Sequence, residues 1–202
     1  MLTSRYKQAF NRQLEPMARA IAACGITPSM ITLAGVALSA LVCVVFVRTQ
    51  AVGPFCVAIL LTGAFDAIDG AVARAANRAT AFGAYLDAMC DRYVEAMVAV
   101  SVAWVTGYWA LTMGVLIGSL LTSYAKARAA MEVAVSNQEW PDLMERTERD
   151  LLFIAGLAAG LLPWRPWGRD LFWWTLVALN LLVHGTVVQR MLRARAFIRQ
   201  RQ

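Results

Sequence analysis

The sequence predicts an all-α membrane protein with six transmembrane helices, preceded by an amphipathic helix in the membrane interface. Composition is the first basis for this fold class: 59% of the 202 residues are hydrophobic and 16% are charged, against about 25% charged in a typical soluble domain. The second basis is that the apolar residues gather in runs close to the roughly 20 residues that a spanning helix requires. This pattern excludes a disordered chain and argues against a soluble globular domain.

The interfacial helix is expected at residues 1–26. Basic residues such as Arg12 and Arg19 alternate there with apolar residues such as Leu14 and Met17, as in helices that lie flat at a membrane surface. Arg19 interrupts the apolar stretch and no cleavage pattern follows, so the segment does not resemble a signal peptide.

Six apolar runs follow, and these are the expected spans. They cover residues 29–47, 52–73, 82–105, 109–125, 151–162 and 171–188. The fifth run is the shortest and needs residues on both flanks to cross the membrane. Together the runs predict a six-helix bundle over 27–195, and the whole chain, 1–202, is expected to form one membrane domain.

The basic residues predict the orientation of the spans. With six spans, both termini lie on one side, together with the second-to-third and fourth-to-fifth connections. All but three of the 19 Lys and Arg residues fall on that side, the exceptions being Arg48, Arg165 and Arg169. The positive-inside rule therefore predicts a multi-pass protein of the cell membrane with both termini in the cytoplasm. The bases are too dispersed for a nucleic-acid-binding stripe, so no nucleic-acid partner is expected.

Four aspartates at membrane depth are the most informative feature: Asp66, Asp69, Asp87 and Asp91. Each costs roughly 2.5–3.5 kcal/mol at the centre of a spanning helix, so they must face one another, water or cations. The first two are three residues apart and the last two are four apart, so each pair shares a helix face. A polar turn at 74–80 makes the two helices antiparallel neighbours, and the four carboxylates are expected to converge near the cytoplasmic ends.

Such a cluster of oxygen ligands suits a hard divalent ion, and four carboxylates balance two ions. The small residues Gly70, Ala73 and Gly83 let another helix or a flat ligand approach the backbone. Arg74 follows on the side of Asp66, where it is able to clamp a phosphate. The interpretation is a metal–diphosphate site. The alternative is a structural role, with the aspartates holding a cation or pairing with nearby arginines.

The spacing D-x-x-D-G-x-x-A-R-x8-G-x3-D-x3-D, which runs from Asp66 to Asp91, resembles the signature of the CDP-alcohol phosphotransferase family. The resemblance implies that an acceptor hydroxyl attacks the β-phosphorus of a CDP-linked lipid and releases CMP. It implies the following roles: Asp66, Asp69 and Asp87 as metal ligands; Asp91 as a further ligand and the general base; and Gly70, Ala73, Arg74, Thr80 and Gly83 as the CDP site.

The family resemblance also implies partners and cofactors. We expect Mg²⁺, with Mn²⁺ as the alternative, and two bound ions. The substrates are expected to be a CDP-linked lipid and a small phosphorylated polyol, at a site open both to the cytoplasm and to the surrounding membrane lipids. A homodimer is the expected assembly.

The acceptor is predicted from segments beyond the aspartates. S-x-x-K-A-R at 123–128, E-R-x-E-R at 145–149 and Gln189-Arg190 are similar to the phosphatidylinositol-phosphate synthase branch of the family, which implies inositol 1-phosphate. The residues expected to hold its phosphate are Ser123, Lys126, Arg146, Arg149 and Arg190. The sequence departs from the branch at Ala130, where a Glu is usual, and in a long polar connection at 131–144. Basic residues that anchor the helix ends to lipid headgroups are the ordinary alternative.

Several rival functions remain open at this stage. Glycerol 3-phosphate is the nearest alternative acceptor. A membrane prenyl-diphosphate transferase also uses aspartates and Mg²⁺, but its motifs lie in separate halves of a larger bundle. A cation transporter does not explain Gly70, Ala73, Arg74 and Gly83, and an inactive scaffold is expected to lose some aspartates. His184, the only histidine, is expected to be a packed or hydrogen-bonded core residue, since one histidine makes no zinc site.

Overall fold

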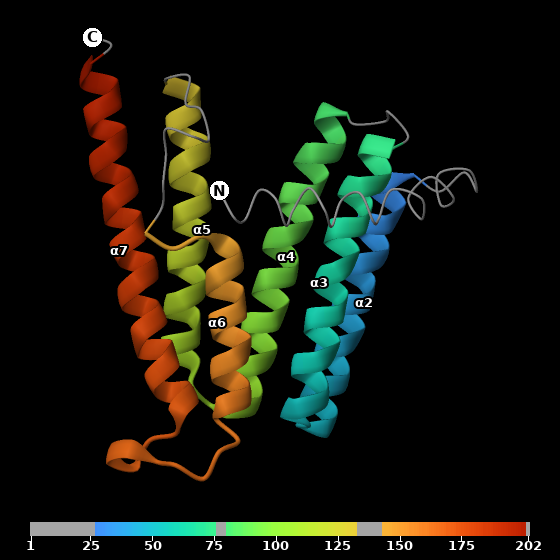
Figure 1. The fold of residues 1–202 in the computed structure, drawn as a ribbon, viewed down its shortest axis with the longest axis vertical. Helices are drawn as coiled ribbons and strands as arrows, with labels where there is room; N and C mark the ends of the chain where they lie inside the picture. The colour runs from blue at the N-terminus through green and yellow to red at the C-terminus, as the bar shows by residue number, and fades with distance from the viewer. Residues whose placement is uncertain (1–26, 76–79, 133–142, 201–202) are drawn as a thin grey trace. The chain divides into compact units, whose positions relative to one another are not determined.

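The computed structural model describes residues 27–75, 80–132 and 143–200, with the side chains of 64–75 and 200 excepted. The expected interfacial helix and most of the 131–144 connection lie outside the described residues. The described chain is entirely helical apart from its turns and contains no strand (Figure 1). Its helices are α2 (Pro28–Thr49), α3 (Val52–Ala75), α4 (Ala81–Thr106), α5 (Trp109–Glu132), α6 (Arg146–Ala159), the short 3₁₀ turn η1 (Pro166–Gly168) and α7 (Leu171–Gln200).

The six expected spans correspond to α2, α3, α4, α5, α6 and α7 in order, which confirms the all-helical prediction. Among the described residues, α2, α5 and α7 are long and apolar enough to cross a membrane; crossing by the other three stays a prediction. With 14 residues, α6 is roughly 21 Å long, short of the ~30 Å hydrocarbon core. The helices α5 and α7 also run beyond their apolar stretches, because Ala, Arg and Met favour a helix without lengthening a hydrophobic run.

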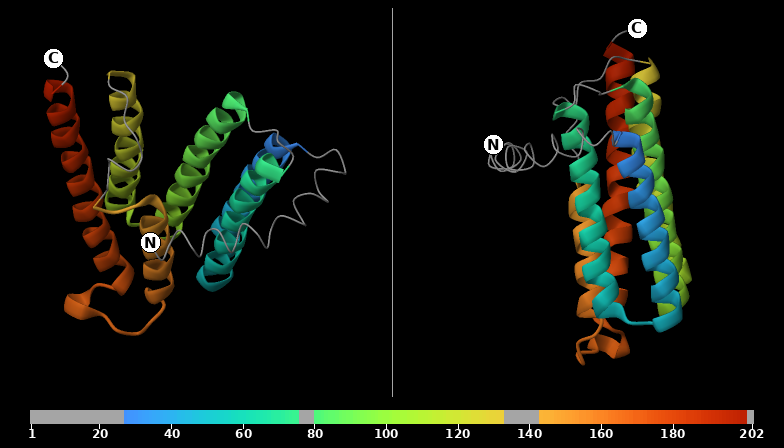
Figure 2. Two further views of the ribbon diagram at one scale, coloured as in Figure 1. Left: turned by 45° about the horizontal axis from the view of Figure 1, so that its top comes forward. Right: turned by 90° about the vertical axis from the view of Figure 1, so that its right-hand side faces the viewer.

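The chain divides into two compact units, Met1–Val98 and Ala99–Gln202, with the boundary inside α4. In the first unit, α2 packs antiparallel against α3 (Figure 2). Gln50 adopts a left-handed conformation and its N–H donates to the carbonyl of Phe46 at 2.7 Å, which ends α2. The rings of Phe46 and Phe55 stack with centroids 3.9 Å apart across the turn. The second helix of this hairpin, α3, contains the first half of the aspartate motif.

In the second unit, α7 is the central element and packs against both α5 and α6. Its buried residues recur at intervals of three and four, the spacing of a helix packed along one seam. They are Phe172, Leu176, Leu179, Val183, Thr186 and Arg190. The last buried residue of this seam is therefore the cationic Arg190, whereas the others are apolar residues and one threonine.

Glycines allow these helices to approach closely. A Cβ atom on Gly114 of α5 would overlap Oδ1 of Asn180, and one on Gly156 of α6 would overlap the side chain of Thr175. Small residues at such points let backbones meet, as is common between membrane helices. The glycines thus bring both α5 and α6 against α7.

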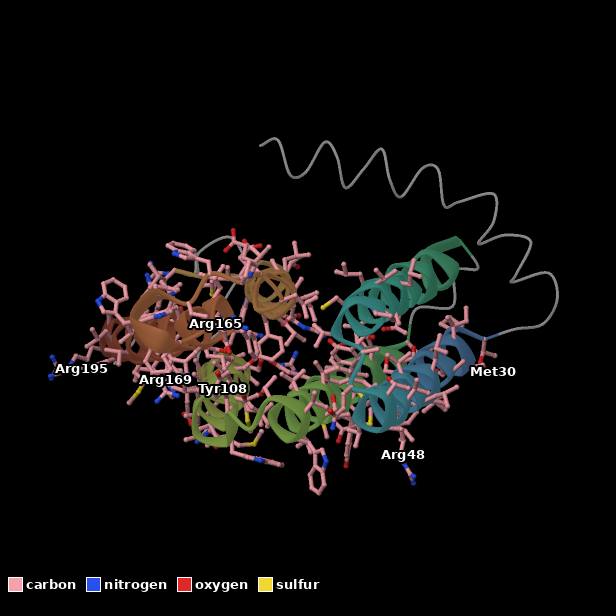
Figure 3. All side chains as sticks on the ribbon, turned by 90° about the horizontal axis from the view of Figure 1, so that it is seen from below. Met30, Arg48, Tyr108, Arg165, Arg169 and Arg195 are labelled. Atoms are coloured by element: carbon pink, nitrogen blue, oxygen red, sulfur yellow. The ribbon has the colours of Figure 1, made fainter. Side chains whose placement is uncertain are left out.

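The end of the second unit that carries the α4–α5 turn is tied together by polar contacts. The hydroxyl of Tyr108 donates to Oδ2 of Asp170 at 2.6 Å, and Oδ1 of Asp170 accepts from the N–H of Trp173 at 2.8 Å, which caps α7. Burial, and then the hydrogen bond to Asp170, raise the pKa of the Tyr108 phenol above its ordinary value. Tyr108 lies here near Arg165 and Arg169 (Figure 3). The hydrogen bond from Tyr108 to Asp170 therefore holds the start of α7 beside the start of α5, while the Asp170 cap fixes the first turn of α7.

We expect Gly156→Ala to destabilise the protein. The new methyl group would stand only 2.6 Å from Cβ of the β-branched Thr175, and stiff side chains yield little. Overpacking of this kind costs about 1–3 kcal/mol, so the midpoint of thermal unfolding in detergent should fall. The control is Gly63→Ala in α3, where nothing lies within 4 Å and stability should hold or rise. An unchanged midpoint for Gly156→Ala would contradict the close α6–α7 contact.

Candidate active site

The aspartate motif spans the end of α3 and the beginning of α4. Asp66, Asp69, Gly70, Ala73 and Arg74 all belong to the last three turns of α3, and their side chains lie outside the described residues. Only five residues separate Ala75 from Ala81, so the end of α3 and the start of α4 follow each other closely along the chain (Figure 1). The two halves of the motif therefore lie on consecutive helices; packing of these helices as neighbours and convergence of the four carboxylates stay predictions.

Thr80 begins α4. Its Oγ1 accepts a hydrogen bond from the N–H of Gly83 at 2.9 Å, and its carbonyl accepts from Ala84 at 3.1 Å. This is an N-cap, which satisfies a backbone donor that the helix itself leaves open. A Cβ on Gly83 would stand 3.0 Å from that same Oγ1, so the glycine keeps the cap compact. The cap is a structural role for Thr80 that the sequence did not indicate, and it leaves the predicted CDP contact untested.

The second half of the motif lies further along α4. Asp87 and Asp91 are both partly buried, and Oδ1 of Asp87 has essentially no exposed surface. Four residues beyond Asp91 stands Glu95, which continues the same interval and so the same face of the helix. Glu95 forms an ion pair with Arg92 at 2.6 Å, and their side chains are 15% and 20% exposed. Sequence reasoning missed Glu95, although the repeated spacing of four was the available signal.

This part of α4 is therefore more acidic than the motif alone indicates, and it contains its own counter-charge. Arg92 is one of the basic residues near the α3–α4 connection, and it forms its ion pair with Glu95. Among the side chains that the structure describes, no three acidic, His or Cys residues gather as a metal site; Asp66 and Asp69 are not in that set.

The predicted acceptor residues all lie in the second unit. Ser123 and Lys126 are on α5, Arg146 and Arg149 on α6, and Arg190 on α7, the helix against which the other two pack.

Two of these arginines are buried, with 4% of Arg149 and 8% of Arg190 exposed. Arg190 donates through Nη1 to the carbonyl of Thr122, one residue before Ser123. The structure thus joins α7 to α5 next to a predicted acceptor residue.

The two α6 arginines share one carboxylate. Nε of Arg146 lies 3.5 Å from Asp150 and Nε of Arg149 lies 3.8 Å from it. Because Asp150 is about half exposed and Arg149 is almost fully buried, the Arg149 guanidinium faces the helix packing rather than solvent. A buried guanidinium is costly unless oxygen atoms surround it, and Asp150 supplies one such partner; a role for Arg149 in binding the acceptor phosphate stays a prediction.

The side chain of Gln189 on α7 contacts the segment that leads into α6. Its Oε1 accepts a hydrogen bond from the N–H of Leu143 at 2.9 Å, which ties the segment before α6 to α7. Glu148 then accepts from the N–H of Glu145 at 3.0 Å and steadies the first turn of α6. In the Gln189-Arg190 pair, the amide therefore positions α6, while the guanidinium occupies the buried seam. The spacing of the motif does not by itself indicate this role for Gln189.

A family model identifies the class of protein. The model for CDP-alcohol phosphatidyltransferases matches residues 25–190, so this chain belongs to that family of transferases. The resemblance predicted from the aspartate spacing is thereby confirmed. The family membership also disfavours a prenyl-diphosphate transferase and a cation transporter.

Individual similar proteins indicate one branch of the family. The chain is 32% identical over 192 residues to a phosphatidylinositol phosphate synthase from Mycobacteroides abscessus, covering 92% of this chain and 84% of that protein. It is 35% identical over 161 residues to an archaetidylinositol phosphate synthase from Pyrococcus horikoshii, covering 77% and 82%. These names belong to the branch that the downstream basic segments indicate.

Solved structures agree with the fold. Phosphatidylinositol phosphate synthase from Mycobacterium tuberculosis, crystallised with CDP-DAG bound, superposes with a TM-score of 0.80 at 26% identity, covering 91% of this chain and 94% of that chain. The same enzyme in complex with manganese and citrate gives a TM-score of 0.79 at 26% identity, covering 90% and 88%.

Proposed function

We propose that this chain is a membrane phospholipid synthase that transfers a phosphatidyl-type group from a CDP-linked lipid to a hydroxyl of inositol 1-phosphate and releases CMP. The observation that carries the proposal is the pairing of a complete CDP-alcohol motif with two buried arginines, Arg149 and Arg190, on adjacent helices. The names of the similar proteins support the same acceptor.

The metal site is proposed at Asp66, Asp69, Asp87 and Asp91. The donor chemistry fits: carboxylate oxygens without histidine or cysteine suit a hard divalent ion, and Asp87 and Asp91 share a face of α4 with one carboxylate oxygen already buried. Manganese bound to a structurally similar enzyme supports a divalent metal. We infer Mg²⁺ as the ion used, with Mn²⁺ as a substitute, and two ions. When bound, such ions neutralise diphosphate charge and make CMP a better leaving group.

The CDP moiety is assigned to Gly70, Ala73, Arg74, Thr80 and Gly83. Arginine binds phosphate oxygens bidentately, and the small residues leave the backbone accessible to a flat group. Asp91 is the proposed general base. It takes the proton of the acceptor hydroxyl while that oxygen bonds to the β-phosphorus, and the bond from phosphorus to CMP breaks with the electron pair leaving on CMP.

The acceptor phosphate is assigned to Ser123, Lys126, Arg146, Arg149 and Arg190. A phosphate dianion adds to the charge compensation that Arg149 receives from Asp150 and to the hydrogen bond that Arg190 donates to the carbonyl of Thr122. Arginine forks match phosphate oxygens in geometry as well as in charge. An uncharged acceptor such as free inositol offers no such compensation, so a phosphorylated polyol is the preferred class.

The membrane arrangement remains as the sequence predicts it. We propose six spans within one domain, an N-terminal interfacial helix, and a multi-pass location in the cell membrane with the active site open to the cytoplasm. The distribution of Lys and Arg supports this orientation. A homodimer is the proposed assembly.

A CMP-release assay tests the function directly. The purified protein is given one CDP-linked lipid, Mg²⁺, and in turn inositol 1-phosphate, glycerol 3-phosphate, inositol and serine. We expect turnover with inositol 1-phosphate to exceed turnover with inositol or serine by about tenfold or more, because buried charge-assisted hydrogen bonds to the phosphate are each worth about 1.5–3 kcal/mol. The comparison with glycerol 3-phosphate, which carries the same phosphate, tests the polyol part of the acceptor. Preference for glycerol 3-phosphate would move the enzyme to the alternative acceptor, and preference for an uncharged acceptor would refute the arginine pocket.

We expect Asp91→Asn to abolish CMP release while CDP-lipid binding persists. The amide keeps the size of the side chain but accepts no proton, so the chemical step fails. Binding is measured with the radiolabelled CDP-lipid and turnover by CMP release. The matched control is Glu95→Gln, the same kind of change one turn along α4, which should retain turnover. Normal turnover by Asp91→Asn would remove it as the base.

We expect Arg149→Gln to raise the KM for the phosphorylated acceptor by about 10- to 100-fold, the equivalent of one charge-assisted hydrogen bond. The KM for CDP-lipid should change little. Arg195→Gln is the control, since Arg195 is exposed on α7 and points away from the helices (Figure 3). Equal effects of Arg149→Gln on both substrates would place Arg149 outside the acceptor site.

A further inference from the structure

Side chains of α7 reach main-chain carbonyls of α5 at three levels. Asn180 donates through Nδ2 to the carbonyl of Leu111 at 2.9 Å. His184 places Nε2 3.2 Å from the carbonyl of Gly114. At the far end of the contact, Arg190 donates to the carbonyl of Thr122. The two helices are thus linked along most of their shared length, and the last link contains a predicted acceptor residue.

The first two links occupy hollows that glycines create in α5. A Cβ on Gly114 would overlap Oδ1 of Asn180, and a Cβ on Gly118 would stand 2.6 Å from Cγ1 of Val183 and 3.2 Å from Cε1 and Nε2 of His184. Gly114 and Gly118 are four residues apart, as are Asn180 and His184, so each pair occupies one face of its helix. Two side chains seated in two hollows define one register between the helices.

Sliding by one residue along an α-helix is a shift of about 1.5 Å. Such a slide would lift both side chains out of their hollows and break both hydrogen bonds. The imidazole of His184 is otherwise exposed, so in a spanning helix it faces lipid, where an unsatisfied polar group is unfavourable. The need to keep His184 hydrogen-bonded therefore disfavours other registers of α7 against α5, in addition to the packing of the glycine hollows. The prediction of hydrogen bonding for His184 is confirmed, whereas its placement in the core is wrong.

We propose that His184 and Asn180 are positioning residues for the acceptor phosphate. By fixing α7 against α5, they set where Arg190 stands relative to Ser123 and Lys126. His184 lies six residues from Arg190, about 9 Å along the helix, so it acts through the register and not by contact. Errors of about 1 Å in such positions reduce rates severely. The expected change in kinetics rests on the proposed function. The expected register between α7 and α5 rests on the hydrogen bonds alone.

The kinetic test compares His184→Leu, which removes the donor, with His184→Gln, whose amide donates in the same way. CMP release is measured against inositol 1-phosphate and against CDP-lipid. His184→Leu should raise the KM for inositol 1-phosphate about three- to tenfold, in line with one hydrogen bond between membrane helices, and leave the KM for CDP-lipid within about twofold. His184→Gln should restore most of the loss. The control, Leu181→Ala, changes a side chain of α7 that is 72% exposed and should alter neither constant.

An equal rise in KM for both substrates, or no rescue by His184→Gln, would overturn the positioning role.

A second experiment does not depend on enzyme activity. Because the chain contains one histidine, ¹⁵N-histidine labelling gives a single imidazole in the NMR spectrum. A carbonyl oxygen only accepts, so Nε2 must carry a proton, and Gly118→Ala should shift its signal while Leu181→Ala should not. An unprotonated Nε2 would refute the hydrogen bond from His184 to the carbonyl of Gly114. This result would be independent of what the acceptor assay shows about the proposed function.

Discussion

The requirement that every polar or charged group in an apolar helix find a partner governs this structure. Arg92 pairs with Glu95 within α4, Arg190 donates to a carbonyl of α5, and His184 reaches the carbonyl of Gly114. In a medium that offers few water molecules, each such group either pairs or destabilises the fold. The residues proposed to bind substrate, on α3, α4, α5, α6 and α7, are subject to the same requirement.

The helix α7 carries much of this organisation in the second unit. One face forms the buried seam, and its glycine-lined contacts with α5 and α6 bring three helices together. The same helix bears Gln189, which anchors the segment before α6, and Arg190, which ends the seam. Packing and binding therefore share one element, so a change that disturbs the packing of α7 also displaces the proposed phosphate ligands.

Sequence reasoning succeeded where the signal was local. Apolar runs located all six helices because hydrophobicity changes sharply at membrane boundaries, and the aspartate spacing identified the family. It failed where the deciding contact depends on atoms that hydropathy does not describe. The Gln189 link to Leu143 joins residues far apart in the chain. The Thr80 cap and the Arg92–Glu95 pair are local, and they were missed because hydropathy describes neither a backbone hydrogen bond nor an ion pair. The predicted bounds of α5 and α7 are too short, because hydropathy follows the membrane and not the helix.

The sequence alone therefore determined the class of the protein and the chemistry of its motif, because residue type and spacing along one helix already specify which side chains share a face. Only the tertiary structure decided which basic residues are buried and which are surface anchors. Arg190 and Arg195 are both arginines near the end of α7, yet one is 8% exposed and the other lies on the surface. The difference arises from the register of α7 against α5 and α6, which depends on contacts between residues far apart in the chain.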